Sequence, residues 1–488
     1  MSWIPDAIAY QINLRTLAAR EPRNPIEAAS EEELGTSPLA YLTRNLDVLR
    51  ALGVTLLHLA PPYPAGKAFQ SGAGMRTAPR DLTGTDPALG SVVEMKAFVR
   101  SAHVHGFKVI FDVTPHITSR DHAWVLSKTD HYLRRQDGGV AAEVEGSDSA
   151  LLDLARTEVR RAVVESLDAW LSLLGLNEDG VIDGIDGFAI DHPFTADSDD
   201  AWREIVRDLT SRHLDRTLLF LAAGEGGEHS VRLFDLGFTA AEDAALYGAC
   251  GQIYGVDDAG QTVTDMTGAI PGDGPAGAIE QILMQGESRL RDRGDGALFT
   301  RYTDHRDGGR GAYRFGEGAV LAMNQLLFLS GHCLPTLVSG QEFGAVNRSS
   351  LATRISTFAN GRRVHRPGGA VTLQDGIEFE GNLFAEGVRK RKGWYAFYRE
   401  LMVLRRSAPE LTCGEFALIE AGEKSPESQR TVVAFERRHA DQIVRCAVNI
   451  GSAPRELAHA DLFQRRPLYG GLINGALAPF TSIVVRST

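Results

Sequence analysis

Short continuous apolar runs alternate along this chain with longer stretches in which apolar residues recur at helical spacing. Residues 7–12 form the first run, residues 38–53 form an amphipathic stretch that ends in a glycine, and residues 54–59 form the next run. A short run of this kind is typical of a strand buried on both faces, and the glycine-terminated stretch is typical of a helix. The pattern therefore predicts a unit of strand, helix and strand.

This unit repeats through most of the chain. Helices that alternate with near-continuous apolar strands predict a parallel sheet covered by helices. Eight such units favour a closed barrel over an open sheet. Further helices are predicted at residues 91–105, 156–174, 200–213 and 394–406. Further strands are predicted at residues 107–111, 187–191, 218–224, 233–238, 297–302 and 334–339.

Two regions break the alternation. Residues 116–149 are polar and rich in charge, and they are too long for an ordinary connection, which predicts a short insertion after the third strand. Near the C-terminus the pattern changes to short alternating strands, which predicts a separate all-β sandwich domain over residues 410–488. The predicted fold class is therefore α/β, a (β/α)8 TIM barrel formed by residues 1–115 and 150–409 with that insertion and that C-terminal domain. The C-terminal strands are predicted at residues 431–436, 442–448 and 482–486.

Composition and charge narrow the class of partner. The chain has 488 residues and a formal net charge of −12, which argues against a nucleic acid or an anionic membrane surface as a partner, because either would require a basic face. It has no run of about 18 apolar residues and no signal-peptide pattern at its start, which predicts a cytoplasmic protein without a membrane segment. The cysteines lack CxxC spacing, so neither a zinc site nor a disulfide framework is predicted, and we expect them to be reduced and mostly buried. They are Cys250, Cys333, Cys413 and Cys446.

Acidic residues stand at or just beyond the ends of four predicted strands. Asp112 follows the third strand, Asp191 closes the fourth, Glu225 follows the fifth and Asp307 lies beyond the seventh. Barrel enzymes place catalytic residues at the C-terminal ends of their strands. A single acid at such a place could equally cap the helix that follows, but four in series predict an active site at this end of the barrel.

The order of these elements resembles the α-amylase superfamily of glycoside hydrolases and transglycosylases, and the resemblance covers nearly the whole chain. Residues 10–15 look like the family's opening strand, residues 60–64 like the end of its second strand, and residues 85–91 like the run into the next helix. Residues 340–344 (GQEFG) resemble the stretch after its eighth strand. The resemblance implies the barrel, the insertion and the C-terminal β-sandwich of that family.

The four acidic strand ends match the four signature regions of this family. Asp112 opens the first region, Asp191 closes the second, Glu225 lies in the third and Asp307 in the fourth. The resemblance implies that Asp191 is the nucleophile and Glu225 the general acid/base. It also implies that Asp307 holds sugar hydroxyls and stabilises the transition state, and that Asp112 orients the site.

These residue types fit a retaining glycosidase. One ionised carboxylate forms a glycosyl-enzyme, and a carboxylic acid about 5 Å away protonates the leaving oxygen. A third carboxylate nearby raises the pKa of that acid by repulsion between like charges. The resemblance therefore implies a retaining α-glycoside hydrolase or transglycosylase that acts on short α-linked glucose-containing di- or oligosaccharides. This chemistry requires no cofactor, and no metal site is predicted.

The chain departs from the family at residues that grip the sugar next to the cleaved bond. Ala189 stands where the family has an Arg, two positions before the nucleophile. His116 stands where an Asn is expected in the first region, and His305 and Arg306 replace Asn-His in the fourth. The cation that would hold the nucleophile ionised and oriented is therefore missing from its usual place.

Two functions remain open. In the first, the protein is an enzyme with a rebuilt sugar subsite, in which Arg306 or Arg310 supplies the missing cation and His116 or His192 supplies hydroxyl contacts. In the second, it is a non-catalytic relative used for carbohydrate binding or assembly. The retained carboxylates favour the enzyme, because an abandoned site has no physical reason to keep mutually repelling acids. The predicted substrate-binding residues are Asp112, His116, His192, His305, Arg306 and Arg310.

Two assignments have competitors within the sequence. Asp304 competes with Asp307, and the spacing from Asp307 to Arg310 favours Asp307. Glu228 competes with Glu225 but lies further from the apolar strand. A loose similarity to the maltosyltransferases that build α-glucan from maltose phosphate keeps transglycosylation open, although those enzymes retain the Arg that is replaced here.

Overall fold

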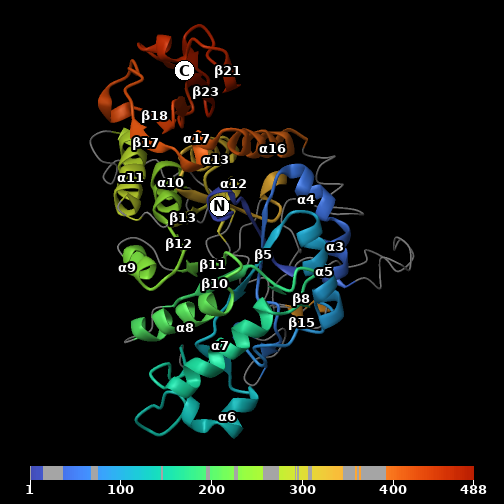
Figure 1. The fold of residues 1–488 in the computed structure, drawn as a ribbon. Helices are drawn as coiled ribbons and strands as arrows, with labels where there is room; N and C mark the ends of the chain where they lie inside the picture. Colours follow the sequence, from blue (N-terminus) through green and yellow to red (C-terminus); the bar gives the residue numbers. More distant parts are fainter. Residues whose placement is uncertain are drawn as a thin grey trace.

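The computed structural model describes the barrel strands, the insertion and the C-terminal sheet (Figure 1). The described residues are 2–14, 37–67, 75–143, 147–193, 198–224, 229–255, 274–291, 293, 296–305, 310–344, 358–359, 362–363 and 392–487.

Eight parallel strands close into a barrel, which confirms the predicted fold. The strands follow one another around the barrel in chain order, and β1 pairs with both β2 and β14 to close it. The barrel strands are β1 (Ala9–Ile12), β2 (Leu56–Leu59), β5 (Lys108–Val113), β10 (Gly187–Asp191), β11 (Leu219–Ala223), β12 (Ala240–Glu242), β13 (Leu298–Arg301) and β14 (Cys333–Val338).

Helices follow the strands and cover the outside of the barrel (Figure 1). Local sequence sets some of their ends. Ser91 and Glu94 form a capping box at the start of α5, and Asn45 divides the single helix predicted over residues 38–53 into two. The helices are α3 (Pro38–Arg44), α4 (Leu46–Leu52), α5 (Val92–Val104), α7 (Thr157–Leu171), α8 (Asp199–Arg212), α9 (His229–Asp235), α10 (Ala245–Tyr254), α11 (Gly274–Leu290), α12 (Gly311–Arg314), α13 (Glu317–Leu329) and α16 (Lys392–Ser407).

The sixth barrel strand does not lie where the sequence pattern predicts it. Residues 233–238 form the end of helix α9 and the turn after it, and the strand is β12, which ends at Glu242. A short apolar run does not distinguish a buried helical segment from a strand, because both bury the same residues. Gly237 adopts a left-handed φ of 98°, which ends the helix and returns the chain to the barrel.

Alternate residues of each barrel strand pack on opposite sides of the barrel wall. Outward side chains such as Phe111, Phe188 and Phe220 belong to the large core between the strands and the helices. Inward side chains form a separate, smaller cluster inside the barrel. Its members include Ala9, Leu56, Ile110, Ala189, Leu221, Ala240, Leu298 and Leu334.

The insertion after β5 contains a small antiparallel sheet and short helices. Strand β6 (Ile117–Ser119) pairs with β7 (Ser149–Leu151), and α6 (Ala123–Ser127) and the 3-10 helix η2 (Thr129–His131) lie between them in the chain. Strand β4 (Met75–Pro79), from the loop after β2, contacts β6. The loops that follow the second and third barrel strands therefore pack together at the C-terminal end of the barrel.

The C-terminal region forms a five-stranded antiparallel sheet, which confirms the predicted change to an all-β architecture. One face, with Val433 and Phe435, joins the core shared with the barrel helices. The opposite face, with Val432 and Ala434, packs with Leu477 of a small two-stranded sheet. The five strands, in order across the sheet, are β17 (Glu415–Leu418), β18 (Val432–His439), β19 (Gln442–Asn449), β23 (Ser482–Ser487) and β21 (Pro467–Gly470), and the small sheet is β20 (Arg455–Glu456) with β22 (Ala476–Leu477).

Two expectations from composition can be compared with the structure. All four cysteines are free; three are buried and Cys413 is exposed. Within the described ranges, no helix has the length and apolarity needed to cross a membrane.

The remaining short elements are η1 (Ile4–Asp6), β3 (Ala65–Gly66), β8 (Gly175–Leu176), β9 (Ile182–Asp183), η3 (Gln341–Phe343), β15 (Phe358–Ala359), β16 (Arg362–Arg363), α17 (Pro409–Cys413), η4 (Glu427–Gln429) and η5 (Ala460–Phe463).

Candidate active site

A ring of inward-facing residues lies at the C-terminal end of the barrel. Side chains alternate along a strand, so the residue two positions beyond each member of the inner cluster also points inward, one layer closer to the mouth. Three of these residues are acidic, and they come from the third, fourth and sixth barrel strands. We call the set the mouth ring: Gln11, His58, Asp112, Asp191, Ala223, Glu242, Thr300 and Thr336.

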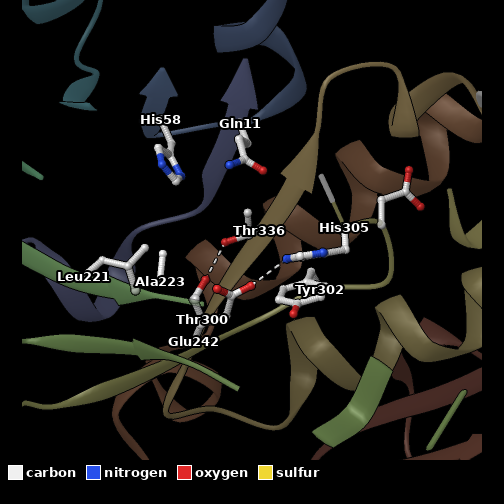
Figure 2. Close-up of a pocket in the computed structure, with 10 residues that line it drawn as sticks. Gln11, His58, Leu221, Ala223, Glu242, Thr300, Tyr302, His305 and Thr336 are labelled. Atoms are coloured by element: carbon white, nitrogen blue, oxygen red, sulfur yellow. Dashed lines mark hydrogen bonds and ion pairs between the residues drawn. The ribbon is translucent and has the colours of Figure 1, made fainter. Parts of the chain in front are cut away.

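Six members of the mouth ring line a cavity of about 30 Å³. Figure 2 shows Gln11 and His58 on one side of it and Glu242, Thr300 and Thr336 on the other. A cavity of this size holds a water molecule but not a sugar ring. A saccharide would therefore have to bind above the ring, on its solvent side.

Asp191 is the last residue of β10 and is 8% exposed. It pairs in register with Ala223 of β11. Burial raises the pKa of Tyr63 to about 12, and the charges of Asp112 and Asp191 act in the same direction. For Glu143, in the insertion, loss of hydration raises the pKa, and the charge of Asp191 adds to this while His192 opposes it. Asp191 thus lies in a mouth bordered by the insertion and by other acidic groups.

Asp112 is held by an imidazole from the neighbouring strand. His58 Nε2 lies 2.6 Å from Asp112 Oδ1, and the two side chains are 5% and 3% exposed. Asp112 also pairs in register with Ala189 of β10, on its other side. No role was predicted for His58 from the sequence, although a lone histidine inside an apolar strand was a visible signal.

Glu242 is a mouth-ring carboxylate that was not predicted, because the sixth strand lies further along the chain than its apolar pattern indicates. One carboxylate oxygen accepts a hydrogen bond from the backbone N–H of Gly224, and the other lies 2.9 Å from His305 Nε2. The His305 ring stacks on Tyr302, with ring centroids 4.7 Å apart. His305 was predicted to bind substrate, and the structure brings it to the mouth through Glu242 (Figure 2).

Asp304 and Arg310 form a buried ion pair. Arg310 Nη1 lies 3.0 Å from Asp304 Oδ2, and the N–H of Gly311 donates to the other carboxylate oxygen at 2.8 Å. Arg310 Nη2 also donates to the carbonyl of Ser339 at 2.7 Å. Burial raises the pKa of Asp304, and the charge of Arg310 partly offsets this. The charge of Arg310 is therefore already balanced by an acid that lines the cavity.

The two predicted histidines differ in their access to solvent. The His192 side chain is 55% exposed, and its Nε2 lies 3.9 Å from Asp191 Oδ1. His116 is 2% exposed, and its ring lies nearly perpendicular to that of Trp202, with the ring centroids 6.0 Å apart. Burial, with a smaller contribution from the charge of His192, lowers the pKa of His116 to about 4. The structure thus brings Asp112, Asp191 and His192 together at the mouth and buries His116 in the protein.

Three predicted site residues lie outside the described residues, namely Glu225, Arg306 and Asp307. Glu228, the competitor of Glu225, also lies outside them. Among the residues that are described, no cluster of acidic, histidine or cysteine side chains could hold a metal ion. The roles assigned to all the candidate residues remain predictions.

Gly224 leads from β11 toward Glu225 and has a left-handed backbone, with φ at 81°. A Cβ at this position would lie 2.6 Å from Cε1 of His192. Gly224→Ala is therefore expected to lower the free energy of unfolding by about 1–2 kcal/mol and to displace the His192 ring. Gly251→Ala, in helix α10 with open space around the added methyl group, should instead raise it by about 0.5–1 kcal/mol. Urea unfolding measures both, and equal destabilisation by the two substitutions would contradict this account.

No protein-family model matches the chain. Curated proteins do match. The α-amylase MalA of Haloarcula japonica is 27% identical over 366 residues, which cover 71% of this chain and 45% of that protein. The trehalose synthase of Pimelobacter sp. is 30% identical over 122 residues, 25% of this chain and 18% of that protein. A maltosyltransferase of Cereibacter sphaeroides that uses α-1,4-glucan and maltose-1-phosphate is 25% identical over 194 residues, 37% of this chain and 28% of that protein. Each match spans less than half the length of the relative.

Solved structures share the fold over the whole chain. The trehalose-6-phosphate hydrolase of Bacillus licheniformis superposes with a TM-score of 0.70 at 15% identity and covers 100% of both chains. A noncanonic maltogenic α-amylase from Thermotoga neapolitana gives a TM-score of 0.68 at 17% identity and covers 100% of this chain and 97% of the other. The class is thus a (β/α)8-barrel protein with a carboxylate-lined mouth. The sequence relatives include an α-amylase and a maltosyltransferase, which agrees with the resemblance of the signature regions.

Proposed function

We propose that this protein is a retaining α-glycoside hydrolase or transglycosylase that acts on short α-linked glucose-containing saccharides. The observation that carries the proposal is Asp191, an acidic residue at the end of the fourth barrel strand that points into the mouth. Catalytic groups of TIM barrels come from the C-terminal ends of the strands.

The reaction would proceed in two steps. In the first, the Asp191 carboxylate attacks the anomeric carbon while Glu225 donates its proton to the leaving glycosidic oxygen. In the second, the Glu225 carboxylate takes a proton from water or from a sugar hydroxyl, whose oxygen attacks the same carbon and releases Asp191. The mechanism requires the two carboxyl groups to lie about 5 Å apart. Support comes from the register of β10 and β11, because Ala223, two residues before Glu225, pairs with Asp191.

Glu242 would act as a positioning residue for the pair formed by Asp191 and Glu225. It accepts a hydrogen bond from the N–H of Gly224, the residue that precedes Glu225. A carboxylate bound to a backbone N–H holds the local chain direction more firmly than a solvent contact does. We therefore expect Glu242 to fix the backbone from which Glu225 extends.

The sugar subsite would be rebuilt around the residues that replace the family pattern. His192, beside Asp191 and half-exposed, is suited to contact sugar hydroxyls. Asp307 would stabilise the transition state. Arg306 would supply the missing positive charge, because the charge of Arg310 is already paired with Asp304. Asp112 and His305 would orient the floor of the site from their pairs with His58 and Glu242.

The names of the relatives support the substrate class, because an α-amylase, a trehalose synthase and a maltosyltransferase all act on α-linked glucose units. Water and a second sugar remain alternative attacking groups, since the relatives' names include both hydrolases and transferases. The four free cysteines support the prediction that the protein acts in the reducing cytoplasm.

A panel of activated α-glycosides tests the proposal. We expect turnover of 4-nitrophenyl α-glucoside or α-maltoside, with release of the α-anomer as the first product in NMR spectra, because a double displacement retains configuration. Maltose as a second solute would reveal transfer through the appearance of longer saccharides. Release of the β-anomer would contradict the retaining mechanism.

One observation favours the non-catalytic alternative, in which the barrel serves carbohydrate binding or assembly. Ala189 leaves the nucleophile strand without the cation that the family carries there. If none of the glycosides in the panel is turned over while maltose or trehalose still raises the melting temperature, this alternative replaces the enzyme.

A further inference from the structure

We propose that His58 supplies, from strand β2, the partner of Asp112 that the superfamily's Arg at position 189 would otherwise provide, and that it acts as a positioning residue for Asp112 and through it for Asp191. The inference rests on the proposed function and identifies a residue of that same site. His58 would compensate for Ala189, which stands two residues before Asp191 where the family has an Arg.

Position 189 lies directly beside Asp112. Strands β5 and β10 are neighbours in the barrel, and Ala189 pairs in register with Asp112. Ala189 points inward, is fully buried, and stands two residues before Asp191 on the same face of the strand. A long cationic side chain at this position would therefore reach Asp112 and Asp191 together. A methyl group reaches neither charge.

His58 approaches Asp112 from the opposite side. In the barrel, β5 lies between β10 and β2, and His58 is the inward residue of β2 in the mouth ring. Its Nε2 lies 2.6 Å from Asp112 Oδ1, with both side chains almost fully buried. The partner of Asp112 thus comes from β2, on one side of β5, and not from position 189 of β10, on the other side.

The need for such a partner follows from the charges at the mouth. Asp112, Asp191 and Glu242 lie in one ring, and a buried carboxylate is stable only when hydrogen-bonded or paired with a cation. Glu242 has His305, and the charge of Arg310 is balanced by Asp304. Imidazoles thus pair with two of the three ring acids, at places in the sequence that differ from the family pattern.

A fixed Asp112 matters for catalysis because it lies on the strand next to Asp191. Small displacements of a reacting group lower the rate strongly, by as much as about 100-fold for about 1 Å. Loss of the His58 contact would let the Asp112 side chain turn, and the nucleophile would then lose a fixed neighbour. The expected effect is on turnover more than on substrate affinity.

The test moves the partner of Asp112 from one strand to the other. His58→Gln replaces the imidazole by a flexible amide that cannot hold Asp112 in the same geometry, and we expect it to lower kcat for 4-nitrophenyl α-glucoside about 10- to 100-fold with KM changed less than about 3-fold. His58→Ala should lose at least as much. Ala189→Arg in the His58→Ala background should restore at least about 5-fold of the loss, since the guanidinium reaches Asp112 from β10. A folded double variant, by circular dichroism, with no gain over His58→Ala would overturn the proposal.

A matched control separates positioning from general stability. His103 Nε2 lies 2.9 Å from Asp186 Oδ2, a second imidazole–carboxylate pair on the same barrel but before the start of β10, at the opposite end from the mouth. His103→Gln should leave kcat within about 2-fold of the wild-type value. An equal loss of kcat in the His58→Gln and His103→Gln variants would show that the contact only stabilises the fold.

A second measurement keeps the proposal separate from the proposed function. The single variants His58→Gln and Asp112→Asn and their combination are compared by thermal unfolding, which requires no activity. We expect the double variant to lose clearly less than the sum of the single losses in melting temperature. Additive losses would overturn the pairing. If the cycle shows coupling but the wild-type protein turns over no glycoside, the proposed function fails and the pairing of His58 with Asp112 stands.

Discussion

Asp191→Asn is expected to lower the turnover of activated α-glycosides by at least about 10³-fold while leaving the protein folded. The substitution keeps the shape of the side chain and removes the negative charge that would attack the anomeric carbon. Because Asp191 is 8% exposed at the end of β10 and points into the mouth, Asn fits the same space. Steady-state kinetics with 4-nitrophenyl α-glucoside measures the effect.

The matched control is an acid of the same type far from the mouth. Asp200 lies in the first turn of helix α8 with its side chain 92% exposed, so Asp200→Asn should change kcat/KM less than about 2-fold. The melting temperature of the Asp191→Asn variant should equal or exceed that of the wild type, because one of several mutually repelling carboxylates is removed. Activity of Asp191→Asn within about 10-fold of wild type would assign the nucleophile to another residue.

The barrel could be predicted from sequence because each strand is a short apolar run buried on both sides, and because the runs alternate with amphipathic helices. Seven of the eight predicted strands coincide with barrel strands. The sixth fails for a definable reason: residues 233–238 bury their apolar side chains as the end of a helix and its turn, whereas β12 is short and consists mainly of alanines. In segments this short, length and periodicity do not distinguish a strand from a buried helical segment.

Only part of the site could be predicted from the sequence. Residues at the ends of clear strands could be predicted, but the residues that contact them could not. Asp112 and Asp191 follow obvious strands, and the structure places both in the mouth ring. The partners of these acids depend on contacts between strands and loops, which the sequence does not display. His58 contacts Asp112 from the next strand, and Arg310 pairs with Asp304.

The mouth is therefore organised by pairs between neighbouring elements. Ala189, on β10, looks like a loss in the sequence, but Asp112 beside it is contacted by His58 from β2, on the other side of β5. Neither the signature regions nor the spacing along the chain displays this contact.

Acidification is expected to destabilise the protein by roughly 3 kcal/mol between pH 6.5 and pH 4 through His116 alone. Burial, with a smaller contribution from His192, lowers the pKa of His116 from 6.5 to about 4 in the folded protein. As the pH falls below 6.5 the unfolded chain takes up a proton at this residue while the folded chain does not, so the free energy of unfolding decreases by about 1.4 kcal/mol per pH unit. The decrease ends near pH 4, where the folded protein also becomes protonated.

Urea unfolding between pH 4 and pH 8, followed by tryptophan fluorescence, measures this dependence, because Trp202 lies against the His116 ring. His116→Asn removes the titrating group, so its stability should fall less steeply with acid and gain roughly 3 kcal/mol on the wild type between pH 6.5 and pH 4. His122, whose pKa burial also lowers to about 4, remains in both proteins and cancels in the comparison. His439→Asn, at an exposed strand end, should follow the wild-type curve. Parallel curves for the wild type and His116→Asn would contradict the burial of His116 and would favour the hypothesis that it contacts sugar hydroxyls in a rebuilt subsite.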